Sequence, residues 1–207
     1  MLYLSGAKNP AIAADMRAGT IGLLNTPRIG YALDEVAVWA LDNGCFTGSY
    51  PGDDAYMAYL ARQEQHRKRC LFVAVPDVLA DAAATLAQFQ PMAGRIRAAG
   101  WPVALVGQDG MEHLDVPWND LEWVFLGGST GWKLGPGAET LIGQAQRHGK
   151  RVHVGRVNSG ARFAKFRALG CDTADGTFIA FAPRLNADYV RQWQARDTQP
   201  PLWVGTR

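Results

Sequence analysis

Two carboxylates three residues apart, Asp172 and Asp175, lie between Gly170 and Gly176 in a stretch of small residues. An isolated pattern of this kind is also common in plain surface turns. A carboxylate at the end of a strand can attack an electron-poor carbon, and a second carboxylate can move the proton that the reaction requires. Because side chains alternate along a strand, only one of the two should face the functional side, and we expect it to be Asp175, which is nearer the strand end.

Several other strand-like runs also end in polar or glycine-rich clusters. If those strands are parallel and adjacent, their carboxyl ends meet on one face. In (β/α)8 barrels this is the face that carries the active site. The group contains several carboxylates and no histidine, which disfavours a Ser-His-Asp hydrolase. A magnesium site and chemistry at an acetal carbon both remain open. The polar residues at these ends, besides the two acids above, are Ser5, Asn25, Asp42, Asn43, Asp77, Gln108, Gly127, Gly128, Arg156 and Asn158.

The elements that would position these residues alternate between strands and helices. The alternation predicts an α/β fold, a compact single-domain (β/α)8 barrel over residues 1–197 with an irregular tail at 198–207. An open doubly wound sheet is the fallback. The chain is shorter than the roughly 250 residues typical of such barrels, so some helices must be short or missing. Strands are expected at 1–4, 21–24, 36–41, 71–75, 102–106, 123–126, 151–154 and 170–174, with helices starting near Pro10, Asp53, Asp81, Ser159 and Asn186.

Composition narrows the class of protein. The three cysteines, Cys45, Cys70 and Cys171, show no C-x-x-C spacing, so we expect neither a disulfide framework nor a zinc module, and a reducing compartment such as the cytoplasm. No apolar run reaches the roughly 18 residues of a membrane span, and a signal-peptide pattern is not found. A net charge of +2 neither requires nor excludes a nucleic-acid partner.

Six short segments, in order, resemble those of the tRNA-guanine (queuine, archaeosine) transglycosylases. Leu41–Phe46 is similar to their D-S-G-G-F signature, and Gly170–Asp175 resembles G-x-D-x-F-D, whose last aspartate is the nucleophile. The order of the segments is more specific than any single match. The four between them are Val75–Asp77, like the purine-recognising aspartate segment, Val106–Gly110, like V-Q-G-G, Leu126–Gly128, like G-G-L, and Gly155–Ser159, where the family carries G-V-G-T-P.

The departures point to one branch of that family. The family's zinc module is absent from the sequence, as is the segment after the nucleophile that helps to grip tRNA. The shorter chain and the stretches at 127–134 and 155–159 are more similar to the phage-type deazapurine-in-DNA transglycosylases. The resemblance therefore implies a cofactor-free exchange of guanine in DNA for a 7-deazaguanine base of the 7-cyano type. It leaves open tRNA as the substrate and an oligomeric assembly.

The resemblance also implies a role for each matching residue. Asp175 would attack C1′ of the sugar, Asp42 would move the proton, and Asp77 would read the N1–H and 2-amino edge of the purine. Gln108 and the Gly127–Gly128 backbone would hold O6. Phe46 would be a stacking surface for the base. Asn43, Arg156, Asn158 and Asp172 complete the expected substrate-binding set, and Trp132, Lys133, Arg162 and Lys165 are expected to hold backbone phosphates.

Three other readings of the same residues stay open. A DNA or nucleoside glycosylase would use water as the acceptor in place of a second base. A barrel that only binds nucleic acid would use the polar face without chemistry, and a metal-dependent barrel hydrolase would use the carboxylates as ligands. His153 lies in the middle of a predicted strand, and we expect it to be a packed histidine and not a catalytic base.

Overall fold

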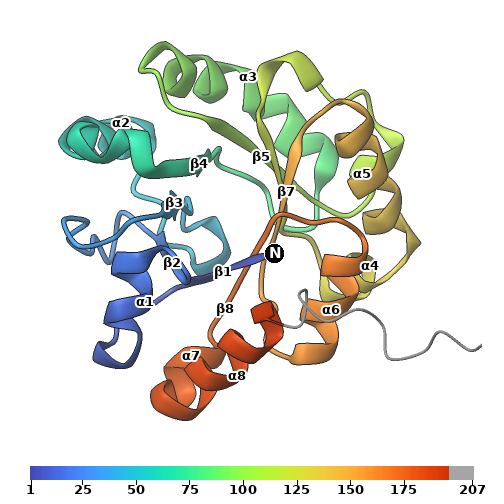
Figure 1. The fold of residues 1–207 in the computed structure, drawn as a ribbon. Coiled ribbons are helices and arrows are strands. Elements are labelled where there is room, and N and C mark those ends of the chain that lie inside the picture. The colour runs from blue at the N-terminus through green and yellow to red at the C-terminus, as the bar shows by residue number, and fades with distance from the viewer. Residues whose placement is uncertain (196–207) are drawn as a thin grey trace, which may run out of the picture.

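The computed structural model describes residues 1–195, which form a closed barrel of eight parallel strands in chain order (Figure 1). The predicted (β/α)8 barrel is confirmed, and the tail expected at 198–207 lies outside the described residues. Every strand pairs with its neighbours in sequence, and β8 closes on β1. The strands are β1 Leu2–Ser5, β2 Gly22–Asn25, β3 Trp39–Leu41, β4 Cys70–Ala74, β5 Val103–Gly107, β6 Trp123–Leu126, β7 Arg151–Val154 and β8 Thr173–Gly176.

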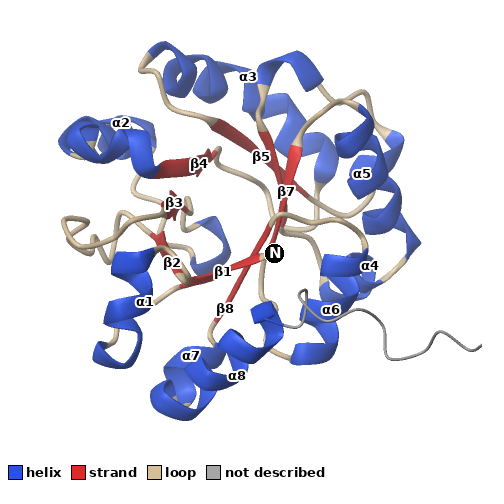
Figure 2. Cartoon of the chain, in the orientation of Figure 1, coloured by secondary structure: helices blue, strands red, loops and turns tan. Residues whose placement is uncertain are grey.

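Helices surround the strands on the outside of the barrel (Figure 2). Asp81 and Ser159 cap helices as predicted, accepting hydrogen bonds from Ala84 N at 2.9 Å and Arg162 N at 3.3 Å. Several helices are short, as expected from the chain length. Their bounds are α1 Ala13–Ala18, α2 Asp53–Arg62, α3 Ala82–Ala98, α4 Thr130–Leu134, α5 Pro136–Arg147, α6 Gly160–Ala168, α7 Phe178–Phe181 and α8 Pro183–Ala195.

The starts of the last strand and the last helix differ from the sequence-based expectation. The last strand begins at Thr173 and not at Gly170, because Gly170 takes the left-handed conformation (φ 78°) that ends the turn after α6. The last helix begins at Pro183, so Asn186 lies inside it and caps nothing. Its Nδ2 instead donates to Phe178 O at 2.6 Å, which ties α8 to α7.

The interior of the barrel is filled by side chains, so it is a packed core and not a channel. Phe72 of β4 is fully buried and contacts the rings of Trp123 and Phe125, with centroids 5.1 and 5.9 Å away. A second, larger apolar cluster lies between the strands and the helices. The interior cluster closes the barrel beneath the strand ends, so a ligand must enter from the face on which the strands end.

Within residues 1–195 there is no helix whose length and apolar character would let it cross a bilayer.

Candidate functional site

A cavity of about 240 Å³ opens at the carboxyl ends of the strands. Every strand from β3 to β8 contributes residues to it, either from its last positions or from the loop that follows. The structure therefore brings together most of the residues that the sequence singled out as chemical. The lining residues are Asp42, Asn43, Phe46, Thr47, Asp77, Leu79, Val106, Gln108, Phe125, Gly127, Gly155, Arg156, Asp175 and Thr177.

Asp175 lies in β8 with one carboxylate oxygen held and the other free. Its Oδ1 accepts a hydrogen bond from Arg156 N at 3.2 Å and lies 3.1 Å from Nε2 of His153. Within residues 1–195 no hydrogen bond reaches Oδ2. The side chain is 15% exposed, so solvent and a ligand can reach it. A carboxylate anchored through one oxygen presents the other as a fixed nucleophile.

His153 supports this carboxylate from inside the barrel. Its ring is fully buried between Phe72 and Phe125, with centroids 4.9 and 4.4 Å away, and Nδ1 lies 2.8 Å from Oγ1 of Thr173. Burial lowers the pKa of His153, so its ring is neutral near pH 7. Because a carboxylate only accepts hydrogen bonds, Nε2 must carry the proton, and Nδ1 then accepts from the Thr173 hydroxyl.

The sequence reading missed this contact. His153 is packed, as expected, but it also holds the candidate nucleophile. The signal lies in the register of β7 and β8, in which His153 pairs with Thr173, two residues before Asp175 on the same face of the strand. That register is set by the closed barrel, and the sequence of either strand alone does not predict it.

Asp42 follows β3 and lies at the same cavity. Burial and the nearby charge of Asp175 raise its pKa to about 6, while a hydrogen bond from Gly44 N at 3.3 Å opposes the shift. A carboxyl group whose pKa lies near 6 can give and take a proton close to neutral pH. This is the property expected of the residue that moves the proton between leaving and entering groups.

The raised pKa of Asp42 predicts that replacing it with asparagine stabilises the protein at high pH. The folded protein holds the Asp42 proton up to about pH 6, whereas the unfolded chain releases it near the ordinary value of about 4. The contribution of Asp42 to the free energy of unfolding therefore falls as pH rises from about 4 to above 6. Because the residue is partly exposed, we expect Asp42→Asn to gain about 1–2 kcal/mol relative to the natural protein between pH 4 and pH 8.

Denaturant unfolding of both proteins at the two pH values measures this difference. Asp115→Asn is the matched control, because Asp115 is exposed and lies away from the cavity. A difference between Asp42→Asn and the natural protein that stays constant with pH would show that Asp42 titrates normally.

Asp77 is held rigidly at the wall formed by the β4 loop. Asn43 Nδ2 donates to its Oδ1 at 2.8 Å, and Gln108 Nε2 donates to its Oδ2 at 2.6 Å. Burial raises the pKa of Asp77 despite these bonds. Gln108 Oε1 in turn accepts from Ala80 N at 2.9 Å, which fixes the amide orientation. Gln108 thus orients Asp77, and Asp77 keeps lone pairs that can accept from the N–H groups of a ligand.

The turn after β6 differs from the expectation that its N–H groups would hold an oxygen of the substrate. The N–H groups of Gly127 and Gly128 both donate to Gly107 O at 3.0 Å. Their carbonyl oxygens accept from the guanidinium of Arg156. In this structure the turn therefore has no free donor, and a ligand oxygen would have to replace Gly107 O.

Arg156 also covers the ring that was expected to stack on a base. Its guanidinium lies 4.5 Å from the ring centroid of Phe46, whose side chain is 56% exposed. The backbone of Arg156 is in the left-handed region (φ 61°), which directs its N–H toward Asp175. Phe46 thus offers a flat face at the cavity, and the planar guanidinium of Arg156 stacks on it.

Three predicted substrate-binding residues are not part of the cavity lining: Gly128, which adjoins the lining residue Gly127, and Asp172 and Asn158, which lie elsewhere. Asp172 precedes β8 at the opposite end of the barrel, where its Oδ2 accepts from Val152 N at 2.8 Å. Asn158 is exposed, and its Oδ1 accepts from Phe178 N at 3.1 Å at the start of α7. Asp172 is a structural cap at the amino ends of the strands, which leaves Asp175 as the acid of this pair that reaches the cavity.

Most of the residues expected to hold phosphates are instead bound to other groups of the protein. Lys133 is only 3% exposed and donates to Gly155 O at 2.5 Å, and burial together with Arg156 lowers its pKa to about 7. Trp132 donates to Glu112 Oε2 at 2.9 Å, and Lys165 pairs with Glu139 at 2.8 Å. Lys133 in this position supports the Gly155–Arg156 turn and does not reach a phosphate. Within residues 1–195 the guanidinium of Arg162 makes no hydrogen bond or ion pair.

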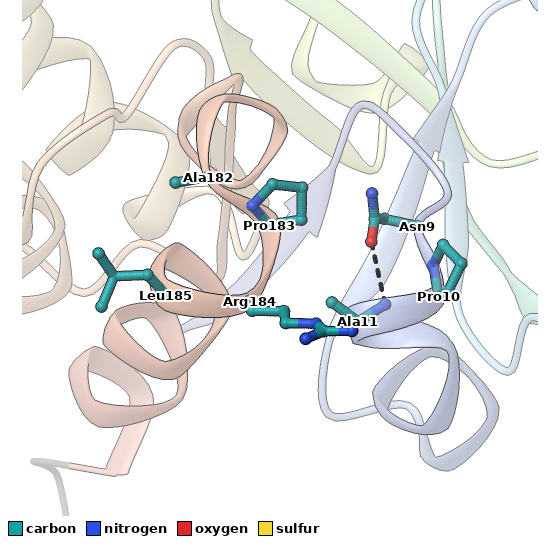
Figure 3. Close-up of a pocket in the computed structure, with 7 residues that line it drawn as sticks. All are labelled: Asn9, Pro10, Ala11, Ala182, Pro183, Arg184 and Leu185. Carbon is teal, nitrogen blue, oxygen red and sulfur yellow. Dashed lines mark hydrogen bonds between the residues drawn. The ribbon is translucent and has the colours of Figure 1, made fainter.

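A larger hollow of about 660 Å³ lies on the outside of the barrel between Asn9–Ala11 and Ala182–Leu185 (Figure 3). Its wall contains no acid, cysteine or histidine, and Asn9 Oδ1 is already used by Ala11 N at 3.0 Å. The part of the chain that the structure describes also holds no group of three or more His, Cys, Asp and Glu side chains placed to bind a metal ion. The acids that could carry chemistry line the cavity at the strand ends and not this hollow.

Comparison with known proteins supports the architecture. No protein-family model matches the chain, and no curated protein sequence does. A solved structure of a 4-hydroxy-2-oxoglutarate/2-dehydro-3-deoxyphosphogluconate aldolase superposes with a TM-score of 0.60 over 93% of both chains, at 13% identity. The protein has a TIM-barrel fold. A designed cube-shaped protein cage built from symmetric oligomeric domains matches with a TM-score of 0.54 over 95% of this chain and 73% of its own, also at 13% identity. Likenesses at this identity establish the barrel alone and say nothing of substrate.

Proposed function

We propose that this protein is an enzyme that exchanges a guanine in DNA for a 7-deazaguanine base. The exchange proceeds through an ester between Asp175 and C1′ of the deoxyribose. The observation that carries the proposal is the state of Asp175 at the cavity: Oδ1 is bound by Arg156 N and His153, and Oδ2 has no hydrogen bond from residues 1–195. The ordered resemblance to the transglycosylases supports it, because residues from each of its six segments line this cavity.

The first half of the reaction expels the original base. Asp175 Oδ2 attacks C1′, and the bond between C1′ and N9 breaks with its electron pair leaving on guanine. Protonated Asp42 gives its proton to the departing base, which its pKa of about 6 permits. Asp77 accepts from the N1–H and 2-amino groups, which selects a guanine-like edge.

The second half runs in the reverse sense with a different base. The entering 7-deazaguanine loses its N9 proton to ionised Asp42, and N9 attacks C1′ as the ester bond to Asp175 breaks. The Asp175 carboxylate and the Asp42 proton are both restored, so the cycle needs no other reactant. Two displacements at one carbon retain its configuration, as in retaining glycosidases.

The size of the cavity agrees with a single base as the ligand. Its volume of about 240 Å³ lies below the roughly 300–1,000 Å³ of pockets for drug-sized molecules. The buried floor of Phe72 and Phe125 prevents deeper insertion. A base bound here would lie within reach of Asp42, Asp77 and Asp175, which share the cavity wall.

Incubation with isotopically labelled guanine tests the proposal. The protein is mixed separately with duplex DNA, single-stranded DNA and tRNA, and nucleosides from each polymer are analysed by mass spectrometry. We expect label in DNA, and its displacement when 7-cyano-7-deazaguanine is added in excess. Label in tRNA alone would move the activity to RNA. Free guanine released without incorporation would identify a hydrolytic glycosylase, and no change in any polymer would leave a binding protein.

A further inference from the structure

Among residues 1–195 most of the large exposed apolar side chains lie in the segments that follow the carboxyl ends of strands, the end at which the cavity opens, and two of them, Phe46 and Leu79, line the cavity. Solvent-exposed apolar residues concentrated on one face mark a surface that contacts a partner. They are Ile29 after β2, Phe46 after β3, Val78 and Leu79 after β4, Leu114 after β5 and Phe181 after β8, while Leu185 and Tyr189 lie on α8.

The Val78–Leu79 pair is presented by a fixed turn. Val78 N donates to Thr85 Oγ1 at 3.0 Å, and Ala80 N donates to Gln108 Oε1 at 2.9 Å. Ala80 has a positive φ of 57°, which is unusual for a residue with a side chain. Val78 is 37% exposed and Leu79 is 48% exposed, and Leu79 also lines the cavity. A strained turn that holds apolar side chains in water is a device expected at a functional site.

Two arginines without a partner among residues 1–195 lie in segments that follow the carboxyl ends of strands. The guanidinium groups of Arg28, Arg162 and Arg184 make no hydrogen bond or ion pair with residues 1–195. Arg28 adjoins Ile29 in the segment after β2, and Arg162 lies in the first turn of α6, whereas Arg184 lies at the outer hollow in Figure 3 and is not counted in this group. Other arginines, such as Arg97 and Arg191, pair with carboxylates at 2.8 and 2.7 Å. Guanidinium groups that no residue of 1–195 binds, on the same side as exposed apolar side chains, suit a polyanion whose interior is apolar, and a nucleic-acid duplex has that character.

We infer that Leu79, supported by Val78, is a wedge that enters the base stack of duplex DNA when the target guanine is drawn into the cavity. The inference rests on the proposed function and deepens it by naming a duplex as the substrate. The cavity lies below the protein surface, so a paired base reaches Asp175 only after leaving its stack. An apolar side chain that fills the vacated space reduces the cost of opening, as in proteins that insert wedges between base steps.

The experiment compares Leu79→Ala with Leu185→Ala in labelled-guanine exchange on duplex and single-stranded DNA of the same sequence. Leu185 is the matched control, since it is an exposed leucine on α8 at 58% exposure and is not part of this cavity. We expect Leu79→Ala to lower the ratio of duplex to single-strand exchange about tenfold or more, and Leu185→Ala to leave the ratio unchanged. A Leu79→Ala ratio equal to that of the natural protein would overturn the inference.

A binding measurement separates failure of the wedge from failure of the proposed function. A duplex carries 2-aminopurine beside the target guanine, and its fluorescence rises when the stack opens. We expect a rise with the natural protein that is lost with Leu79→Ala and kept with Leu185→Ala. A rise without any guanine exchange would retain the wedge and reject the transglycosylase. Exchange on duplexes without a fluorescence rise would reject the wedge and retain the enzyme.

Discussion

Replacing Asp175 with asparagine is expected to lower the rate of base exchange about a thousandfold or more. The amide has the shape of the carboxylate but lacks the charge that attacks C1′, so the covalent ester cannot form. Its carbonyl oxygen still accepts from Arg156 N and from His153 Nε2, which preserves the local structure. Initial rates of labelled-guanine incorporation measure the loss. The mass of the protein–DNA adduct after acid quenching measures the ester directly.

Asp172→Asn is the control for this prediction, because it makes the same chemical change three positions earlier. Asp172 lies at the other end of the barrel, where its Oδ2 accepts from Val152 N at 2.8 Å. We expect exchange by Asp172→Asn to stay within a few-fold of the natural rate. Full activity of Asp175→Asn, or an equal loss in both variants, would show that Asp175 is not the nucleophile. Thermal unfolding of each variant checks that a loss is chemical and not a failure to fold.

The barrel itself was predictable because its strands are apolar on both faces and are separated by helical segments. The apolar runs predicted which residues are buried more accurately than they predicted where each strand begins and ends. The run at 36–41 was expected to be one strand, yet only Trp39–Leu41 joins the sheet. Val36 N donates to Leu33 O within a turn, and Ala37 N donates to Met16 O. Val36 is apolar because it packs in the core, which is a different requirement from pairing in a sheet.

The acids of the site were predictable because residues at the carboxyl ends of the strands all lie on one face of a barrel. Asp42, Asp77 and Asp175 each follow or end a strand, and all three line the cavity. The burial of Lys133, in contrast, could not be predicted from its position after a strand. Lysine side chains usually lie in solvent, but the five-residue helix α4 places Lys133 against Gly155 O, where it is buried. The directions of the Gly127 and Gly128 N–H groups likewise depend on the close approach of Gly107 O.

His153 is expected to be the strongest contributor to the rate among residues that touch no substrate. Replacing it with leucine removes the donor to Asp175 Oδ1 and leaves only Arg156 N to fix the carboxylate. Misplacement of a reacting group by about 1 Å can cost roughly a hundredfold. We expect His153→Leu to lower kcat about 10- to 100-fold with little change in KM, because the histidine orients the nucleophile and does not bind the base.

His153→Gln provides the matched test of this positioning role. A glutamine amide can donate to Asp175 and occupies a similar volume, so we expect it to recover most of the rate that the leucine variant loses. Single-turnover formation of the protein–DNA adduct separates the chemical step from binding. Equal rates for the natural protein and His153→Leu, or equal losses in the leucine and glutamine variants, would reduce His153 to a packing residue.

The neutral state of the ring matters as much as its position. An imidazolium beside Asp175 would neutralise the charge that attacks C1′, whereas a neutral N–H orients the carboxylate and leaves that charge in place. The Thr173 hydroxyl, 2.8 Å from Nδ1, secures the required tautomer by donating to the nitrogen that lacks a proton. Thr173→Val removes that donor, and we expect a loss of about tenfold in kcat.

Nitrogen chemical shifts of His153 test the tautomer directly. They should show a proton on Nε2 in the natural protein whether or not exchange occurs, and a proton on Nδ1 would contradict this arrangement.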